Sequence, residues 1–551
     1  MFASREAQLF LEGLEDPEAT QSSVLLRKTL APNRDCEFGR AHGFDKITSV
    51  AEYQRAVPIQ KYDGFADSIR RIVHDGEQGI LTKDRVKRFF MTSGSTSEPK
   101  YIPVTSRFIQ AKSRAFGIYW SSVFGDHPAA KEGRMITNFS DSGVPGKTPG
   151  GIECGSESSF WAGVTRATQL SKAPIIPKPV AQIKDSNARY YTLARILLEE
   201  SFSVIMTLNP STILLLFKKI QEFAEPLFRD IEHGTLSSDV EVSDVVREFV
   251  AATYKGNPAR AEALRALAAE SGGEGLMAHR LWPDLSLAIC WRSPMLKPYI
   301  DLLDPHFGGR VAGRDYMMMA SEGIMGVPLH DGGSGGVCGV GLHFYEFVPE
   351  DEIDKPDPTV LLPHQVEVGK TYVLILTNGS GLYRYNIGDV IRVSGFERKA
   401  PIIEFLHRAG RTCSLTGEKL TETQVTAAIE DAGRELGLEV EGFTVAPAPE
   451  GFPHYVAYLE LRSEASPDAL GSFPKAFDAA LDRHNIEYGS KRGSQRLAAP
   501  ELWVVEAGTY AKLRQQRTAA GASDSQIKPM HLTRDASFAE RVNVTSRHQA
   551  G

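Results

Sequence analysis

The sequence predicts an α/β protein with a large N-terminal domain of layered sheets and helices and a small α+β C-terminal domain. A chain of 551 residues is longer than one hydrophobic core usually serves, so more than one domain is expected. Residues 188–200, 203–207 and 210–223 have the patterns of a helix, a strand and a helix, an order typical of a layered core. After Phe405, strands and helices alternate over a length sufficient for a second domain. We therefore expect an N-terminal domain over 1–405, a hinge over 406–419 and a C-terminal domain over 420–551.

Composition and charge are those of an ordinary globular protein. Hydrophobic residues make up 42% and charged residues 24% of the chain, and the net charge of −7 gives no basic footprint for nucleic acid. The start has charges inside its apolar run, unlike a signal peptide, and the apolar segment 211–220 is too short to span a membrane. The five cysteines are widely separated and form no C-x-x-C pair, which favours a reduced, cytoplasmic compartment over a disulfide framework or a zinc cluster.

Periodicity and capping residues predict the remaining elements. Apolar residues recur at helical spacing over 7–31 and over 242–269, and Asn209-Pro210 has the form of an N-cap followed by a first-turn proline. Residues 281–291 are expected to form a buried strand, with Trp282 and Trp291 in the core or in a pocket wall. Further strands are expected over 372–376, 381–393, 442–448, 455–461 and 502–505, and further helices over 421–436 and 468–486, before a final basic helix and loop.

Small residues form a candidate phosphate-binding loop between two short strands. Thr92, Ser93, Gly94, Ser95, Thr96 and Ser97 are followed by Lys100. Small residues let backbone N–H groups approach an anion, hydroxyls add donors, and one lysine supplies positive charge. The alternative is a plain Ser/Thr-rich surface turn. Because β-prone residues flank the stretch on both sides, the loop is expected to be held at both ends.

A second candidate stretch is 315–328, where an apolar run delivers Ser321, Glu322 and Gly323 at its end. A glutamate that is buried there needs a counter-charge, a metal ion or water, whereas a solvated strand end needs none. The following glycine-rich segment 331–341 does not have the spacing of a dinucleotide-binding motif and predicts a hairpin loop. Asp389, beside Gly388, is expected at a strand-to-turn junction, either as turn chemistry or as a holder of two ribose hydroxyls.

Several other chemistries have no motif in this chain. A Walker A loop requires G-x-x-x-x-G-K-[ST], but Gly94 stands six positions before Lys100, which Pro99 precedes and Tyr101 follows. The chain has no G-x-S-x-G elbow and no H-E-x-x-H motif, so its sequence does not support a serine-hydrolase or a zinc-protease function.

The stretch from Phe89 to Lys100 has the pattern FxxTSGSTSEPK, which resembles the AMP-binding signature of adenylate-forming ligases. Further blocks narrow the resemblance to the acyl-acid amido synthetases of the auxin-responsive Gretchen Hagen type, in a bacterial-looking member, over nearly the whole chain. These blocks are VPIQKY (57–62), LWPDLSLAI (281–289), ASEG (320–323), GLYRYNIGDVIRVSGF (381–396), LTGEKLTETQV (415–425) and QIKP (526–529).

The resemblance implies roles for the matching residues. The loop from Ser93 through Gly94, Ser95 and Thr96 to Ser97, with Lys100, would hold the ATP phosphates. Ser321, Glu322 and Gly323 would lie at the nucleotide, with Glu322 at Mg²⁺. Tyr385 and Asp389 would line the ribose side. Arg408 and Lys419 would act from the hinge, and Lys528 would be the late lysine that a mobile C-terminal domain brings to the adenylate.

Three departures from the family pattern stand out. Met318 occupies the place of an aromatic residue four before the glutamate, which makes Tyr316 a candidate for stacking on adenine. The phosphate loop lacks the second glycine of plant members, and the late QIKP block lacks the arginine that usually follows its proline.

The resemblance implies a two-step ligase. With ATP and Mg²⁺, a carboxylic acid would form an acyl-adenylate and pyrophosphate, and an amine such as an amino acid would then attack the activated carbonyl. Two alternatives remain: transfer to a coenzyme A or carrier-protein thiol, and a nucleotide-binding protein without ligase turnover. No nucleic-acid or membrane partner is expected, and the chain is expected to be a monomer or weak oligomer. Residues 116–120, 160–161 and 282–291 are candidate walls of an aromatic acid pocket, or simply core.

Overall fold

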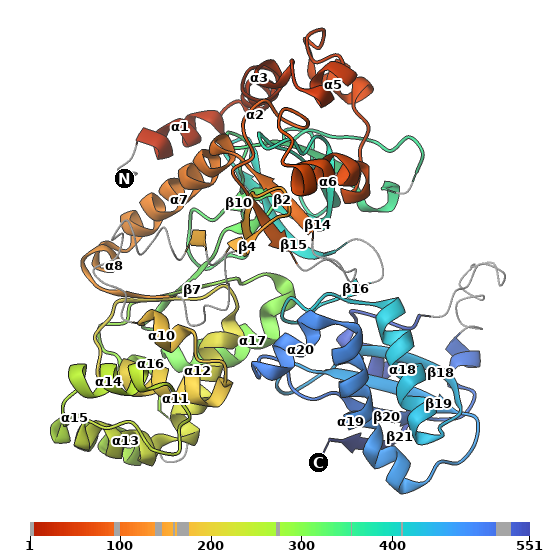
Figure 1. The fold of residues 1–551 in the computed structure, drawn as a ribbon. Helices are drawn as coiled ribbons and strands as arrows, with labels where there is room; N and C mark the ends of the chain where they lie inside the picture. The colour runs from red at the N-terminus through yellow and green to blue at the C-terminus, as the bar shows by residue number, and fades with distance from the viewer. Residues whose placement is uncertain are drawn as a thin grey trace. The chain divides into compact units, whose positions relative to one another are not determined.

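The computed structural model describes residues 5–92, 100–137, 146–157, 160–161, 176–270, 276–353, 355–408, 412–513 and 530–550. The chain divides into two compact units, Met1–His407 and Arg408–Gly551 (Figure 1). Each unit combines helices with sheets, which confirms the predicted α/β class. The division falls within the segment 406–419, whose role as a hinge stays a prediction.

The first unit is built around a seven-stranded sheet with the order β12-β13-β14-β15-β11-β10-β9. Five of its neighbouring strand pairs are antiparallel: β12–β13, β13–β14, β11–β15, β10–β11 and β9–β10. Its strands are β9 (Met318–Ala320), β10 (Gly323–Val327), β11 (Gly336–Cys338), β12 (Phe344–Pro349), β13 (Thr371–Thr377), β14 (Tyr385–Glu397) and β15 (Ala400–Arg408).

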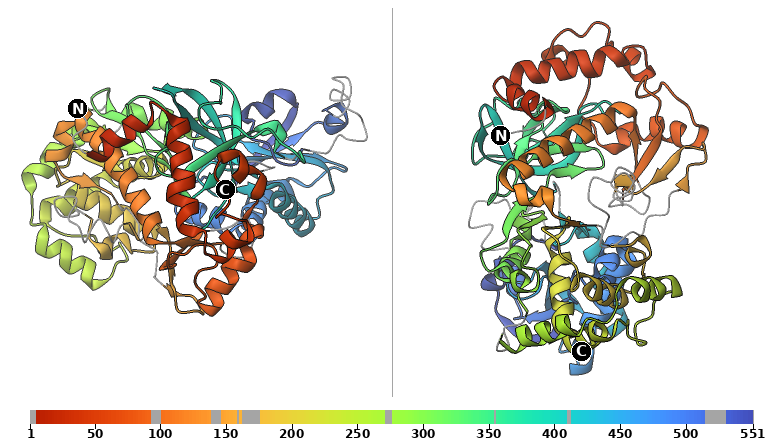
Figure 2. Two further views of the ribbon diagram at one scale, coloured as in Figure 1. Left: turned by 90° about the horizontal axis from the view of Figure 1, so that it is seen from above. Right: turned by 90° about the vertical axis from the view of Figure 1, so that its left-hand side faces the viewer.

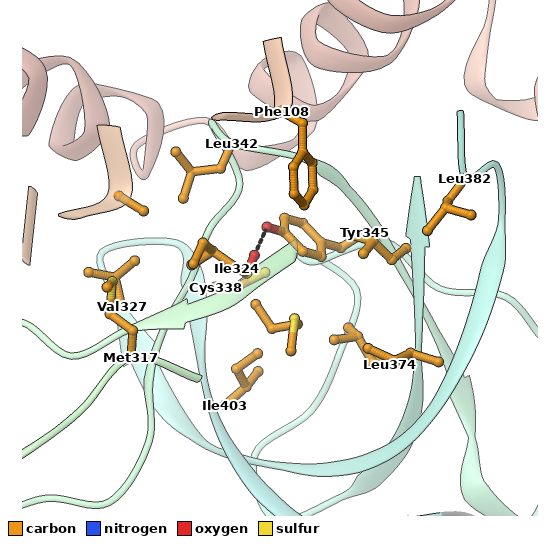
Figure 3. Packing of buried hydrophobic residues seen from close by; sticks show 14 of the residues in the cluster. Phe108, Met317, Ile324, Val327, Cys338, Leu342, Tyr345, Leu374, Leu382 and Ile403 are labelled. Carbon is orange, nitrogen blue, oxygen red and sulfur yellow. Dashed lines mark hydrogen bonds between the residues drawn. The ribbon is translucent and has the colours of Figure 1, made fainter. Parts of the chain in front are cut away.

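The long helix α7 (Ser106–Asp126) packs against this sheet, and Thr105 caps its start by accepting a hydrogen bond from the Phe108 N–H at 3.3 Å. Phe108 from the helix joins Ile324 and Tyr345 from the sheet, and Leu342 from the turn before β12, in one apolar cluster (Figure 3). The Tyr345 hydroxyl is buried there and donates to the Ile324 carbonyl, so its polar end is satisfied inside the core.

The N-terminal helices are attached to the same sheet by Gln21, which is fully buried. Its amide nitrogen donates to the carbonyls of Val340 (2.5 Å) and His343 (2.8 Å), and its amide oxygen accepts from the Tyr345 N–H at 2.7 Å. The predicted helical region 7–31 is confirmed, although it is divided into α1 (Arg5–Gly13), α2 (Pro17–Ser23), the π-helix η1 (Val24–Leu30) and α3 (Ala31–Asn33). The helices α4 (Glu37–Ala41), α5 (Val50–Ala56), η2 (Tyr62–Phe65) and α6 (Ala66–Asp75) follow.

A small sheet with the order β2-β1-β5-β4 carries the ends of the candidate phosphate loop. Strand β1 (Arg88–Thr92) pairs antiparallel with β2 (Lys100–Val104), and Thr92 lies opposite Lys100. The predicted strand, loop and strand are therefore confirmed at both strands. Strands β4 (Gly146–Lys147) and β5 (Glu153–Gly155) complete the sheet.

The third sheet of the first unit is parallel, with the order β3-β6-β7-β8, and helices surround it in Figures 1 and 2. Strand β6 (Val204–Met206) and the helices α11 (Ser186–Leu197) and α12 (Pro210–Glu222) confirm the predicted order, and the Asn209 side chain accepts from the Ser211 N–H as the predicted cap. The other strands of this sheet are β3 (Met135–Ile136), β7 (Leu287–Cys290) and β8 (Ala312–Asp315). The other helices of this part of the chain are α8 (Pro128–Glu132), α10 (Lys178–Ala181), α13 (Ala224–His233), α14 (Asp244–Thr253), α15 (Pro258–Glu270), α16 (Ala278–Leu281), η3 (Pro294–Leu296), α17 (Lys297–Leu303) and η4 (Asp304–Phe307).

Two predictions in this unit are corrected in extent. The strand expected over 281–291 is limited to β7, because α16 ends at Leu281 and the Trp282 indole is buried beside α11, where it donates to the Leu197 carbonyl at 2.6 Å. The glycine-rich segment contains the expected hairpin turn, but its second half enters the large sheet as β11.

The second unit is an α+β domain with the strand order β18-β19-β20-β21. The helices α18 (Glu422–Leu436) and α19 (Pro467–His484) pack on one face of the sheet, and a smaller cluster around Trp503 and Phe538 covers the other. A capping box between Thr421 and Gln424 begins α18. The elements are β16 (Thr412–Cys413), β17 (Leu420–Thr421), β18 (Val440–Pro447), β19 (Tyr455–Leu461), α20 (Ile486–Gly493), β20 (Glu501–Val505), η7 (Ala536–Arg541) and β21 (Val544–Gln549).

Strand β21 was not predicted, because the segment 544–549 is mostly polar and has no apolar stripe. It pairs antiparallel with β20 at the end of the sheet, and its side chains alternate between half-buried and exposed. Of the helices in the described part of the chain, none has the length and apolar character needed to cross a membrane.

His343 gives the first unit a pH-dependent stability. Its ring is 2% exposed beneath α7, and burial, followed by the charge of Lys112, lowers the pKa of its imidazole to about 3. In an unfolded chain the pKa is about 6.5. Because the folded pKa is the lower one, the unfolded state takes up the proton first, and stability present above pH 6.5 is lost as the pH falls toward 3.

We expect the wild-type protein to lose about 1.4 kcal/mol more than a His343→Leu variant between pH 8 and pH 5.5. Thermal melting of both proteins at the two pH values measures this difference. A substitution of the exposed His74 by Gln serves as the control and should leave the wild-type pH dependence unchanged. Identical pH dependence of the wild type and His343→Leu would contradict the assignment.

Candidate active site

The candidate site is centred on the turn between β9 and β10. Ala320 lies opposite Gly323 in the register of these strands, so Ser321 and Glu322 are the two turn residues. Glu322 is only 5% exposed, so it does not lie at a solvated strand end. The Tyr385 hydroxyl lies 3.5 Å from Glu322 Oε1 and donates toward it. Of the two alternatives that the sequence left open, the structure therefore has the buried glutamate with a polar partner.

Two further side chains hold the backbone of this turn. The Asn378 amide donates to the Glu322 carbonyl at 2.8 Å, and the Lys112 ammonium donates to the Ala320 carbonyl at 2.7 Å. Gly323 is tightly packed, because a Cβ there would lie 3.0 Å from Leu376 and 3.1 Å from His343, and both side chains would have to shift to admit it. The turn is therefore held by Lys112 from α7 and by Asn378 from the β13–β14 loop, and it is packed against Leu376 and His343.

Tyr385 is oriented by a strained residue before it. Arg384 has a φ of +46°, a conformation that is costly for a residue with a side chain. Its guanidinium pairs with Glu346 at 3.0 Å and donates to the carbonyls of Gln54 (2.7 Å) and Val57 (2.8 Å). These bonds offset the strain and direct the following Tyr385 toward Glu322.

Asp389 lies within β14 and not at the strand-to-turn junction that the sequence predicts. The strand continues from Tyr385 to Glu397, because Gly388 takes a φ of +80° and its N–H donates to the Asn386 side chain at 2.9 Å. Asp389 is 6% exposed. Its proposed contact with ribose stays a prediction.

Lys100 begins β2, and its ammonium lies 5.3 Å from the centre of the Tyr62 ring, a cation–π distance. The Tyr62 hydroxyl accepts a hydrogen bond from the Tyr101 N–H at 2.9 Å. Burial raises the pKa of Tyr62, and the charge of Glu322 contributes to this shift. The loop residues Ser93, Gly94, Ser95, Thr96 and Ser97 lie outside the described residues.

Aromatic residues of the predicted acid pocket gather near Lys112. The ring of Trp161 lies 4.8 Å from Phe116 and 5.1 Å from Phe160, and its indole donates to Glu157 at 3.0 Å. Trp282 is not part of this group, since it packs against Phe202 in the helical part of the unit. Tyr316, the candidate for adenine stacking, is 6% exposed and packs edge-on against Tyr119, so adenine stacking by it stays a prediction.

Arg408 and Lys419 belong to the second unit, and Lys528 lies outside the described residues. Lys419 has a φ of +51° and follows Glu418, whose carboxylate accepts from the Thr416 N–H and hydroxyl at 2.7 and 2.8 Å and from Tyr455. The loop that carries Lys419 is therefore built on a buried carboxylate. The action of these residues on the Glu322 site stays a prediction.

The donor set fits Mg²⁺ that is bound together with a nucleotide. Among the described residues no group of three or more His, Cys, Asp or Glu side chains is placed to hold a metal ion. Mg²⁺ commonly binds through one or two carboxylates together with phosphate oxygens, and the single buried Glu322 carboxylate matches that pattern.

Sequence reasoning missed three residues of the site: Tyr62, Lys112 and Asn378. Lys112 carried a usable signal, because it stands four residues after Phe108 and three before Ala115, on the buried face of a helix. A lysine on such a face requires a counter-charge. Asn378 and Tyr62 carried no comparable signal, since their contacts join distant parts of the chain.

Comparison with known proteins identifies the family. The GH3 family N-terminal domain matches residues 7–311, its central domain 337–408 and its C-terminal domain 423–537. An indole-3-acetic acid-amido synthetase, GH3.4 of Arabidopsis thaliana, is 25% identical over 95% of this chain and 90% of its own. A jasmonoyl–L-amino acid synthetase, JAR6 of Nicotiana attenuata, is 26% identical over 91% of this chain and 89% of its own.

A solved structure shares the fold. The acyl acid amido synthetase AtGH3.15 in complex with 2,4-DB has a TM-score of 0.66 and 22% identity, and the match covers 99% of this chain and 97% of that one. With its three domain matches spanning most of its length and this agreement in fold, the chain belongs to the GH3 family.

Proposed function

We propose that this protein is an ATP-dependent acyl-acid amido synthetase. It converts a carboxylic acid and ATP into an acyl-adenylate and pyrophosphate, and then transfers the acyl group to an amine, with an amino acid as the favoured acceptor. The observation that carries the proposal is the buried Glu322 turn, fixed beside Tyr385 in a GH3-family chain. One relative is named an amido synthetase and another a jasmonoyl–L-amino acid synthetase, and these names support an amino acid as the acceptor.

The first unit supplies the residues for adenylation. Lys100 and the loop from Ser93 to Ser97 bind the phosphates, Asp389 binds the ribose hydroxyls, and Glu322 is the protein ligand of Mg²⁺. Mg²⁺, when bound, neutralises charge that develops on the departing pyrophosphate. The ammonium of Lys100 stabilises the same charge from the protein side, and Tyr385 keeps the Glu322 carboxylate in one orientation.

The acid binds beside the aromatic group of Phe116, Phe160 and Trp161. An aromatic or extended apolar acid fits such a wall, because flat rings bury large apolar area against one another. Its carboxylate attacks the α-phosphorus of ATP, and pyrophosphate leaves. In the second step the amine attacks the acyl carbonyl, AMP leaves and an amide forms, while Arg408, Lys419 and Lys528 act from the second unit.

We expect a Lys100→Ala variant to lose pyrophosphate exchange by about two to three orders of magnitude, because one positive charge is removed from the site of charge development. Exchange of labelled pyrophosphate into ATP with a panel of carboxylic acids measures this. The matched control is Lys87→Ala, an exposed lysine directly before β1, which should retain the wild-type rate. An unchanged rate in Lys100→Ala would rule out its assigned role.

A Glu322→Gln variant should require more Mg²⁺ for half-maximal exchange, by about tenfold or more. Glutamine keeps the shape of the side chain and an acceptor for the Tyr385 hydroxyl, so only the charge is removed. Titration of exchange activity with Mg²⁺ at fixed ATP gives the result. The exposed Glu367→Gln variant is the control. A normal Mg²⁺ requirement would show that Glu322 is not a ligand.

Product analysis tests the acceptor. With an acid that supports exchange, a mixture of amino acids and coenzyme A should give an N-acyl amino acid and AMP, detected by mass spectrometry. Formation of the acyl-coenzyme A thioester instead would reject the amide-forming step while retaining adenylation. Binding of ATP without exchange for any acid would reject the ligase function altogether.

A further inference from the structure

Lys112 is a lysine without solvent exposure in the middle of α7. Its side chain is 0% exposed, and its ammonium lies 5.1 Å from the Phe108 ring centre and 5.7 Å from that of Phe90. Removing an ammonium group from water costs several kcal/mol unless other interactions compensate for it. The carboxylate of Glu157, itself 12% exposed, provides the compensating charge through a direct ion pair. The pair joins α7 to the segment that follows β5, 45 residues away along the chain.

The second partner of Lys112 is the Ala320 carbonyl, at 2.7 Å. Ala320 ends β9, which stands last in the strand order of the large sheet. No further strand of that sheet covers the outer edge of β9 within the described residues. The ammonium therefore adds a side-chain donor to the last carbonyl of β9, directly before the turn of Ser321 and Glu322.

The position of Lys112 in the chain connects this turn to the phosphate loop. Lys100 begins β2, and β2 leads through the cap residue Thr105 into α7 without an intervening loop. Only Thr105 separates the strand from the helix, so little chain lies between Lys100 and Lys112 in which the two could move independently. The Lys112–Ala320 bond thus links the segment that carries Lys100 to the turn that carries Glu322.

We propose that Lys112 is a positioning residue for adenylation: with Glu157 as its counter-charge, it holds the Ala320–Glu322 turn against the β2–α7 segment and so fixes Glu322 relative to Lys100. This inference rests on the proposed function. Lys112 acts through the turn, since its side chain is 0% exposed and its ammonium is bonded to Glu157 and to the Ala320 carbonyl. Its effect is on the geometry with which Mg²⁺ and ATP are bound.

The competing explanation is that the pair stabilises only the core. A double variant, Lys112→Met with Glu157→Gln, distinguishes the two explanations. Replacing a buried ion pair by neutral groups is often neutral or stabilising, whereas removal of one partner leaves an unpaired charge. The glutamine still offers an acceptor to the Trp161 indole. The double variant therefore restores stability without restoring the bond to Ala320.

The experiment measures pyrophosphate exchange and thermal melting on the full-length protein. Lys112→Met alone should lower the melting temperature and raise the KM for Mg·ATP by about tenfold. In the double variant the melting temperature should return close to the wild-type value, while the KM for Mg·ATP stays raised by about tenfold. The KM for the acid is measured in parallel, because Glu157 also accepts from the Trp161 indole of the proposed acid wall. A change confined to the KM for the acid would overturn the inference and assign the pair to that wall.

Two controls define the result. Glu157→Gln alone keeps the donor to Ala320 and should lower stability with little change in the KM for Mg·ATP. Arg195→Met breaks another buried ion pair, between Arg195 in α11 and Glu199 just after that helix, and should lower the melting temperature without any change in that KM. Recovery of a wild-type KM for Mg·ATP in the double variant would overturn the inference and leave adenylation intact. Absence of exchange in the wild type with every acid would instead overturn the proposed function, and this inference with it.

Discussion

Compensation of buried polar groups is the constraint on which the first unit depends. Beneath α7 the core encloses the ammonium of Lys112, the carboxylate of Glu322 and, further along the sheet, the guanidinium of Arg384. Each of these groups would destabilise the fold if it were left without a partner. Each instead bonds to a residue from a distant part of the chain, so the bonds that satisfy the core also define the site. Stability and site geometry thus have a common origin here.

The local features of the chain were readable from its sequence, because they depend on neighbours within a few residues. The Asn209 cap, the strands around the phosphate loop and the position of Glu322 at the end of an apolar run are examples. The pairing of Lys112 with Glu157 and the bond from Asn378 to Glu322 could not be read in this way. Both join residues separated by tens of positions, and only the packed fold brings them together.

Backbone conformation was the other limit of the sequence. Asp389 was expected at a turn because Gly388 precedes it, but the glycine serves to continue a long strand through a local irregularity. The strain at Arg384 had no signal at all, since an arginine in the left-handed region is held there by contacts and not by its own preference. The motif letters therefore identified the family, while the geometry that makes the motif work had to come from the structure.

The tight packing at Gly323 affects which parts of this site can change during evolution. A Cβ at this position would lie 3.0 Å from Leu376 and 3.1 Å from His343, so a larger residue beside the Glu322 carboxylate requires these buried side chains to shift. Under the proposed function, reshaping this end of the site therefore disturbs the packing that supports Glu322. Adaptation to new acids is less costly at the aromatic residues on α7 and after β5. The catalytic end and the recognition end of the site are in this way free to evolve at different rates.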